Sequence, residues 1–233
     1  MSDLINAVSP VASAWLAATV LLYFAIKRLH RRYPRQWLAP FIVVPVVLIA
    51  ILLIAHVPYG NYASRSHWLS WMLGPATVAF AVPIYDYRHT IRQHWMPLVV
   101  GVVVGLSVAV GSSVALARLF ELPTTLERSL AVRSISTPFA MMAAPEIGGT
   151  ADLAAIFVVI TGMVGMILGE WVLALLPVST HVARGALFGA GAHAAGTATA
   201  YRRSTDEGVI SSLTMIVAGV LMAICAPLLA CLL

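Results

Sequence analysis

The stretch Gly185-Ala186-Leu187-Phe188-Gly189-Ala190-Gly191-Ala192-His193-Ala194-Ala195-Gly196-Thr197-Ala198-Thr199 lies in a segment of membrane-spanning length, yet it consists almost wholly of small residues and carries one histidine. The stretch Leu73-Gly74-Pro75-Ala76-Thr77-Val78-Ala79-Phe80-Ala81-Val82-Pro83-Ile84-Tyr85 is interrupted by glycine, threonine and two prolines. Irregular backbone survives in a bilayer only where protein or a water-filled cavity satisfies its polar groups. Two interrupted spans therefore indicate a substrate site at mid-membrane and a transporter subunit.

The composition excludes a soluble globular domain. Hydrophobic residues make up 61% of the 233 residues, charged residues make up 10%, and the mean hydropathy is +0.93, whereas about a quarter of a typical soluble domain is charged. We expect an all-α polytopic membrane protein with about seven or eight transmembrane segments, two of them discontinuous. The seven clear apolar runs are 11–29, 38–56, 68–85, 96–120, 151–176, 184–201 and 209–233.

An eighth segment, 126–149, contains Arg128, Arg133, Pro138, Pro145 and Glu146. It is compatible with a lining helix, an amphipathic helix or a re-entrant segment, so whether it crosses the bilayer stays open. The order of smooth and interrupted segments predicts one integral membrane domain over residues 1–233. Within it, the halves 38–120 and 151–233 would form a structural repeat.

The formal charge of +5 does not indicate nucleic-acid binding, because five of the 14 basic residues cluster after the first apolar run. Such a cluster is a topology signal that marks the inside of the membrane. The opening segment lacks a signal-peptide pattern and is expected to remain as a helix. Cys225 and Cys231 lie in the last apolar run with no histidine or acid nearby, so no metal or other cofactor is expected.

Gly74-Pro75 suits the first turn of a half-helix, because proline has a fixed φ and lacks an N–H. The free N–H groups of Ala76 and Thr77, with the Thr77 hydroxyl, would then face the break. The alternative is a kinked packing helix, since proline is common in membrane helices.

In the second interrupted stretch, the spacing of Gly189, His193, Gly196 and Thr197 predicts one shared helical face. Its glycines are equally explained by close helix packing. A histidine at mid-membrane indicates a functional site and a candidate for proton coupling, and the alternative is a hydrogen-bonded core histidine. We predict Gly191, His193, Gly196 and Thr197 as substrate-binding residues.

The interrupted stretches hold no acid before Asp86, whereas a cation site would normally offer an intramembrane carboxylate. Half-helix N-termini and hydroxyl groups favour a small anion instead. The string Arg133-Ser134-Ile135-Ser136-Thr137-Pro138 adds a cation that could hold a carboxylate in two-point contact. Arg133, Ser136 and Thr137 therefore join Gly74, Pro75, Ala76 and Thr77 as candidates, and the alternative for Arg133 is a snorkelling residue at the membrane interface.

The 73–85 string, Arg133-Ser134-Ile135-Ser136-Thr137-Pro138-Phe139-Ala140-Met141 and Glu146-Ile147-Gly148-Gly149 together resemble the LrgB/CidB family of bacterial membrane proteins. His193, Gly196 and Thr197 match the last motif of that family, while Ala192 and Thr199 depart from it. The resemblance implies a multi-pass protein of the bacterial inner membrane. It also implies either antiholin-like control of murein hydrolase export and lysis, with a small LrgA/CidA-type membrane partner, or a carrier like the plastid glycolate/glycerate transporters.

The leading hypothesis is a carrier for small monocarboxylates such as pyruvate, lactate, glycolate or glycerate. The alternative is an antiholin-like or pore-forming protein. A homodimer in the lipid bilayer is compatible with both. No nucleophile elbow, zinc motif or paired acids support an enzyme.

Overall fold

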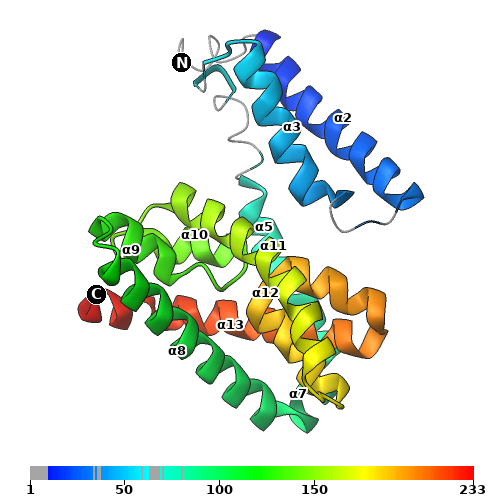
Figure 1. The fold of residues 1–233 in the computed structure, drawn as a ribbon, viewed down its shortest axis with the longest axis vertical. Coiled ribbons are helices and arrows are strands. Elements are labelled where there is room, and N and C mark those ends of the chain that lie inside the picture. The colour runs from blue at the N-terminus through cyan, green and yellow to red at the C-terminus, as the bar shows by residue number, and fades with distance from the viewer. Residues whose placement is uncertain are drawn as a thin grey trace. The chain divides into compact units, whose positions relative to one another are not determined.

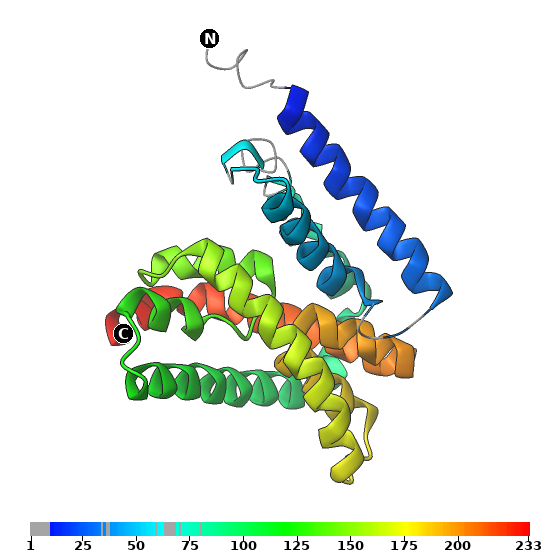
Figure 2. The same ribbon diagram turned by 45° about the horizontal axis from the view of Figure 1, so that its top comes forward.

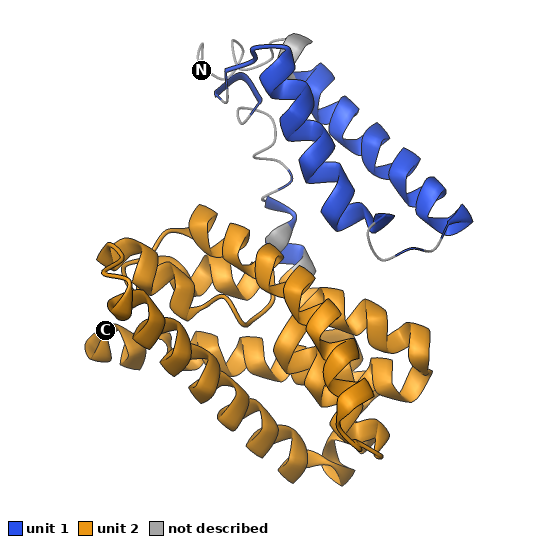
Figure 3. Cartoon of the chain, in the orientation of Figure 1, with its two compact units in different colours: residues 1–75 blue, residues 76–233 orange. Residues whose placement is uncertain are grey.

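A computed structural model describes residues 10–33, 35, 38–58, 60–62, 69, 71–79 and 81–233. Throughout these ranges the regular structure is helical, and they contain no strand. The chain divides into two compact units, residues 1–75 and 76–233 (Figure 3). The expectation of an all-α protein is therefore confirmed.

The first unit contains two helices that pack against each other, α2 (Pro10–Arg32) and α3 (Pro40–Ile54). The last turn of α2 carries Arg31 and Arg32, whose positive charge complements the partial negative charge of a helix C-terminus. α3 begins at a proline, a residue that fits the first helical turn because its missing N–H would have no partner there.

Three short helices follow: α5 (Leu73–Ala79), α6 (Ala81–Asp86) and α7 (Arg88–Gln93). Pro75 lies in the first turn of α5, and Pro83 lies within α6. Gly74 and Pro75 belong to the first unit, and Ala76 and Thr77 belong to the second.

Three long helices of the second unit, α8 (Trp95–Leu119), α11 (Ala151–Leu175) and α13 (Thr205–Leu232), are long and apolar enough to cross a membrane. They account for three of the predicted spans. α3 is apolar but has 15 residues, fewer than the roughly 20 that a membrane-spanning helix needs. The full number of seven or eight spans stays a prediction.

The segment 126–149, whose crossing the sequence left open, turns back on itself. It contains α9 (Thr124–Ala131) and α10 (Thr137–Glu146), joined by a non-helical turn. After α10 the chain returns beside α9, because the N–H of Thr150 donates to Oγ of Ser129 at 2.9 Å. Because the entering and the leaving chain meet at Ser129 and Thr150, α9 and α10 form a hairpin (Figure 1).

α12 (His181–Arg203) also folds back. His193 interrupts the helix with φ 38° and ψ −120°, a conformation that is uncommon for any residue except glycine. A methyl group on Gly196 would collide with the carbonyl oxygen of Phe188, although residues eight apart are separated by about 12 Å along a straight helix. The two arms of α12 therefore lie side by side, next to α13 (Figures 1 and 2).

Contacts with Glu207, at the start of α13, place both ends of α12 together. Arg184 near the start of α12 lies 3.6 Å from the Glu207 carboxylate, and Arg203 at its end lies 3.0 Å from it. The predicted single helical face through residue 193 is therefore wrong, because the positive φ of His193 reverses the direction of the chain.

A hydrophobic core forms around α10, where α8, α11 and α13 also contribute side chains. Its fully or nearly buried members include Val102 from α8, Phe139 and Ala140 from α10, Ala154 from α11 and Met222 from α13. Phe139 packs directly on Gly219, where a Cβ would overlap its ring. This core fixes the α9–α10 hairpin against the long helices.

Candidate functional site

The turns of the two hairpins meet at the middle of α11. In the first turn, Nη1 of Arg133 donates to Oγ1 of Thr161 at 3.3 Å. In the second turn, a methyl group on Gly162 would lie 3.4 Å from Cε1 of His193. Residues 161–165 lie at the midpoint of the 25-residue apolar helix α11, so both turns lie against the middle of that helix.

The hairpins approach this point from opposite ends of α11. The α9–α10 hairpin is joined to the start of α11 through Ser129 and Thr150. The arms of α12 lie near the far end of α11, where Nη1 of Arg203 donates to the Glu170 carboxylate at 2.9 Å. The result is one hairpin from each end of α11, with both turns near its centre.

Arg133 is half-buried and is held by hydroxyl groups. Its Nε donates to Oγ of Ser113 on α8 at 2.8 Å, in addition to the bond to Thr161. Within the described residues it forms no ion pair with a carboxylate. A guanidinium group carries five N–H donors in a planar fork, so donors remain for a bound anion.

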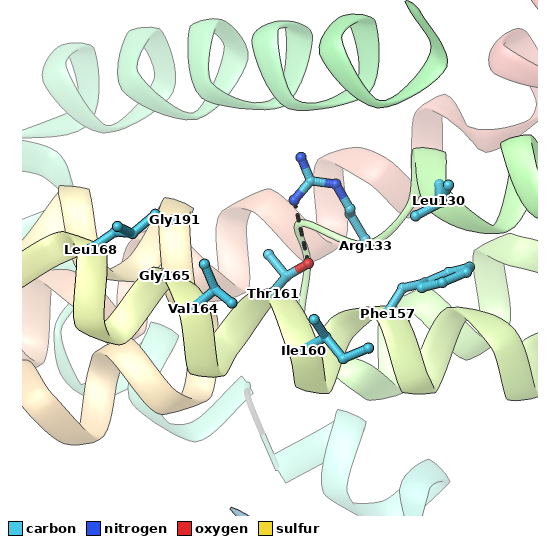
Figure 4. A pocket seen from close by; sticks show the side chains of 9 residues that line it. All are labelled: Leu130, Arg133, Phe157, Ile160, Thr161, Val164, Gly165, Leu168 and Gly191. Atoms are coloured by element: carbon cyan, nitrogen blue, oxygen red, sulfur yellow. Dashed lines mark hydrogen bonds between the residues drawn. The ribbon is translucent and has the colours of Figure 1, made fainter. Parts of the chain in front are cut away.

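A cavity of about 370 Å³ lies beside Arg133 (Figure 4). Apolar side chains of α9 and α11 form most of its wall, and its polar lining comes from Arg133 and Thr161. Gly165 of α11 and Gly191 of the α12 hairpin complete the lining. A mostly apolar cavity with a few fixed polar groups is typical of a small-molecule site.

Two deeply buried side chains near the turns have polar atoms without a hydrogen-bond partner in the described part of the chain. They are Nε2 of His193 and Oγ of Ser136, in residues that are 2% and 3% exposed. The imidazole of His193 lies against Gly162, the residue that follows the Arg133 partner Thr161 on α11. Unpaired polar groups cost free energy when buried, and a ligand or water that paired with them would recover it.

The remaining predicted residues of the hairpins have identifiable positions. Ser136 precedes α10 and Thr137 is its first residue, half-buried. Thr197 is buried and its hydroxyl lies 2.9 Å from that of Ser211 on α13. Gly196 lies against the backbone of Phe188, so Thr197 and Gly196 join the arms of α12 to each other and to α13.

The predicted residues in the first interrupted stretch are divided between the two units. Gly74 and Pro75 are exposed and Thr77 is half-buried. Because Gly74 and Pro75 belong to the other unit, a shared site with Arg133 and His193 stays a prediction.

Sequence reasoning did not identify the ion-pair group at the open end of the α12 hairpin. The Glu207 carboxylate, 3% exposed, lies within 4 Å of His181, Arg184 and Arg203. The four-residue spacing of Arg203 and Glu207 is a signal for a helical ion pair. The partners on the other arm could not have been found in this way, because they depend on the fold-back at His193.

Comparison with known proteins gives the family. The LrgB-like family matches residues 19–232. The uncharacterized protein YwbG of Bacillus subtilis (strain 168) is 38% identical over 214 residues, covering 92% of this chain and 95% of YwbG. YxaC of the same strain is 33% identical, covering 94% of this chain and 95% of YxaC.

The holin-like protein CidB of Staphylococcus aureus (strain Mu50 / ATCC 700699) is 29% identical over 211 residues, covering 91% of this chain and 92% of CidB. No solved structure matches the chain. The matches extend over nearly the full length of this chain and of each relative. The long apolar helices fit a membrane protein. The resemblance to the LrgB/CidB family is thus confirmed, and the chain belongs to the LrgB-like family.

Proposed function

We propose that this protein is a membrane transporter, or the substrate-binding subunit of one, for small monocarboxylates such as pyruvate, lactate, glycolate or glycerate. The observation that carries the proposal is the cavity beside Arg133, where the turns of two opposed hairpins meet at the centre of α11. Broken helices that meet near mid-membrane are the usual substrate site of secondary transporters.

The charge at the cavity favours an anion. A cation at the centre of a membrane helix costs about 3 kcal/mol or more unless it is paired. Arg133 pairs with two neutral hydroxyl groups, and none of the described carboxylates pairs with it. A bound carboxylate would neutralise the guanidinium group and accept two parallel hydrogen bonds from it.

The rest of the wall favours a short, mainly apolar ligand. The volume of about 370 Å³ lies at the lower end of the range for small-molecule sites. Arg133 and Thr161 would bind the polar end of the ligand, and the apolar side chains of α11 would contact its carbon chain. Large polar molecules would find few hydrogen-bonding partners there.

Alternating access would come from motion of one hairpin and its supporting helix relative to the other. The Glu207 ion pairs would close the α12 hairpin at one end of α11. The Arg118–Glu127 ion pair, with Nε to Oε1 at 2.8 Å, would hold α9 of the other hairpin to the end of α8. His193 lies at the turn of the α12 hairpin and has an unpaired Nε2. It is the candidate for carrying a proton with the substrate.

The test is uptake of labelled pyruvate, lactate and glycolate into proteoliposomes that contain the purified protein. We expect saturable uptake in which the three acids compete. Arg133→Gln should abolish it, and Arg133→Lys should weaken it because an ammonium group cannot replace the planar fork. Arg92→Gln is the matched control, since Arg92 is exposed on α7. Equal uptake by wild type and Arg133→Gln would exclude Arg133 from the site.

The names of relatives favour a second candidate. The CidB proteins are named holin-like, so an antiholin-like role in murein hydrolase export and lysis is the alternative, together with an LrgA/CidA-type membrane partner. This function predicts dye leakage without saturation or competition between carboxylates. A carrier predicts both saturation and competition, and retains small dyes inside the vesicles. A homodimer would be compatible with either function.

A further inference from the structure

Several glycines of α11 and α12 are explained by close packing. A methyl group on Gly189 would overlap the backbone oxygen of Ser211, and one on Gly165 would overlap that of Gly191. A methyl group on Gly185 would lie 2.6 Å from the backbone oxygen of Glu207. Larger residues at these three positions would force the helices apart, so their small size serves the fold.

Gly191 differs from these glycines. A methyl group built on it would meet no atom within 4 Å, and its backbone does not adopt a positive φ. Neither packing nor backbone conformation therefore requires a glycine here. Gly191 is nevertheless part of the cavity wall, together with Arg133 and Thr161 (Figure 4).

We propose that Gly191 determines the largest carboxylate that the cavity accepts, an inference that rests on the proposed transport function. The carboxylate would be fixed at Arg133, so the length and branching of the carbon chain decide how far the ligand extends along the wall. Gly191 lines the cavity and an added Cβ would meet open space, which we assign to the cavity. A side chain added there would shorten the space available to the carbon chain without displacing a helix.

The test compares substrate size preferences in proteoliposomes. Wild type, Gly191→Ala and Gly191→Val are assayed with glycolate, pyruvate and the branched acid 2-oxoisovalerate. One methylene group in an apolar pocket changes specificity by about tenfold or more. We expect Gly191→Val to lower the uptake of 2-oxoisovalerate relative to glycolate by about tenfold, with a smaller decrease for Gly191→Ala.

Gly101→Ala is the control, because this glycine of α8 also has nothing within 4 Å of an added methyl group and lies outside the cavity wall. Thermal unfolding in detergent checks that each variant is folded. An unchanged ratio of 2-oxoisovalerate to glycolate in folded Gly191→Val would overturn the role of Gly191 while leaving the transport function intact. Absence of carboxylate uptake by wild type would overturn the transport function, and the inference with it.

Discussion

The backbone of Gly196 lies directly against the carbonyl oxygen of Phe188, eight residues earlier in the same helical segment. This contact brings the second arm of α12 back along the first, and it leaves no room for a side chain at residue 196. The reversal at His193 and the close approach at Gly196 are thus two parts of one hairpin.

The first prediction concerns this contact. Gly196→Ala should destabilise the fold, because an added methyl group would overlap the Phe188 carbonyl and overpacking typically costs about 1–3 kcal/mol. We expect a lower midpoint of thermal unfolding in detergent. Gly191→Ala is the matched control in the same hairpin, because its methyl group meets open space. Equal midpoints for the two variants would contradict the fold-back.

The second prediction concerns topology in the membrane. If both hairpins are re-entrant, residues just before and just after each one lie on the same face. After Cys225 and Cys231 are replaced by serine, single cysteines at Ser179 and Thr205 should react with an impermeant maleimide from one side. Single cysteines at Thr124 and Asp152 should react from the other side. All four wild-type residues are exposed.

The labelling pattern would distinguish re-entrant hairpins from spans. Opposite accessibility of Ser179→Cys and Thr205→Cys would mean that α12 crosses the bilayer. Opposite accessibility of Thr124→Cys and Asp152→Cys would mean the same for the α9–α10 segment. Either result would remove the opposed hairpins from the transport proposal.

The third prediction concerns the carboxylate that joins the ends of α12. Glu207→Gln would leave Arg184, Arg203 and His181 without their shared anion. Removing one partner of a buried ion pair costs about 3–5 kcal/mol, and we expect the lower end because Arg184 and Arg203 are partly exposed. The measurement is thermal unfolding, with Asp206→Asn as the control, since Asp206 is an exposed neighbour in the same turn. A midpoint equal to that of the control would show that these ion pairs do not hold the hairpin.

The sequence predicted the positions of these irregular segments better than their paths. The small residues around His193 predicted an interruption between residues 185 and 199, and His193 in this range has non-helical dihedral angles. A discontinuous membrane span stays a prediction. The reversal itself was not predicted, because it depends on a positive φ at a histidine rather than at a glycine or proline. For the 126–149 segment, the prolines and charges allowed a re-entrant path as one of the alternatives. The sequence could not select this path, because the hydrogen bond from Thr150 to Ser129 that closes it joins residues 21 apart.

The lining of the cavity could be predicted only in part for the same physical reason, and the binding role of its residues stays a prediction. Arg133 and Gly191 could be selected from local sequence, and both lie at the cavity. Ser113 and Thr161 could not, because a hydroxyl residue in an apolar helix usually bonds to its own backbone, as Ser113 also does by donating to the backbone oxygen of Ala109 at 2.6 Å. Their role becomes visible only where three segments converge on one guanidinium group.

The fourth prediction concerns these two hydroxyl groups. Ser113→Ala should weaken carboxylate binding, since Arg133 would lose a 2.8 Å hydrogen bond that fixes its orientation. Hydrogen bonds to charged groups are worth about 1.5–3 kcal/mol, so the KM for uptake should rise by about tenfold. Thr161→Val should have a smaller effect, because its bond is longer, at 3.3 Å. Ser112→Ala is the control, since this hydroxyl on the same helix donates to the backbone oxygen of Ala109. An unchanged KM in Ser113→Ala would mean that Ser113 does not position the guanidinium group for substrate.

The last prediction concerns proton coupling. The imidazole of His193 is buried and has an unpaired Nε2, and it lies against Gly162, which adjoins the Arg133 partner Thr161. A second positive charge beside the guanidinium group would be unfavourable unless a carboxylate were bound there. Substrate and proton should therefore bind more tightly together than separately, because each reduces the cost of the other. We expect an inward proton gradient to accelerate uptake by wild type.

His193→Gln should retain measurable carboxylate binding but lose this acceleration, because glutamine can donate and accept hydrogen bonds yet does not titrate. The measurement is the initial rate of pyruvate uptake with and without the gradient. His94→Gln, which changes another histidine of the second unit that lies outside the Arg133 cavity, is the control. If the gradient accelerates uptake equally in wild type and His193→Gln, the proton is carried elsewhere, and the unpaired Nε2 of His193 serves substrate or water binding alone.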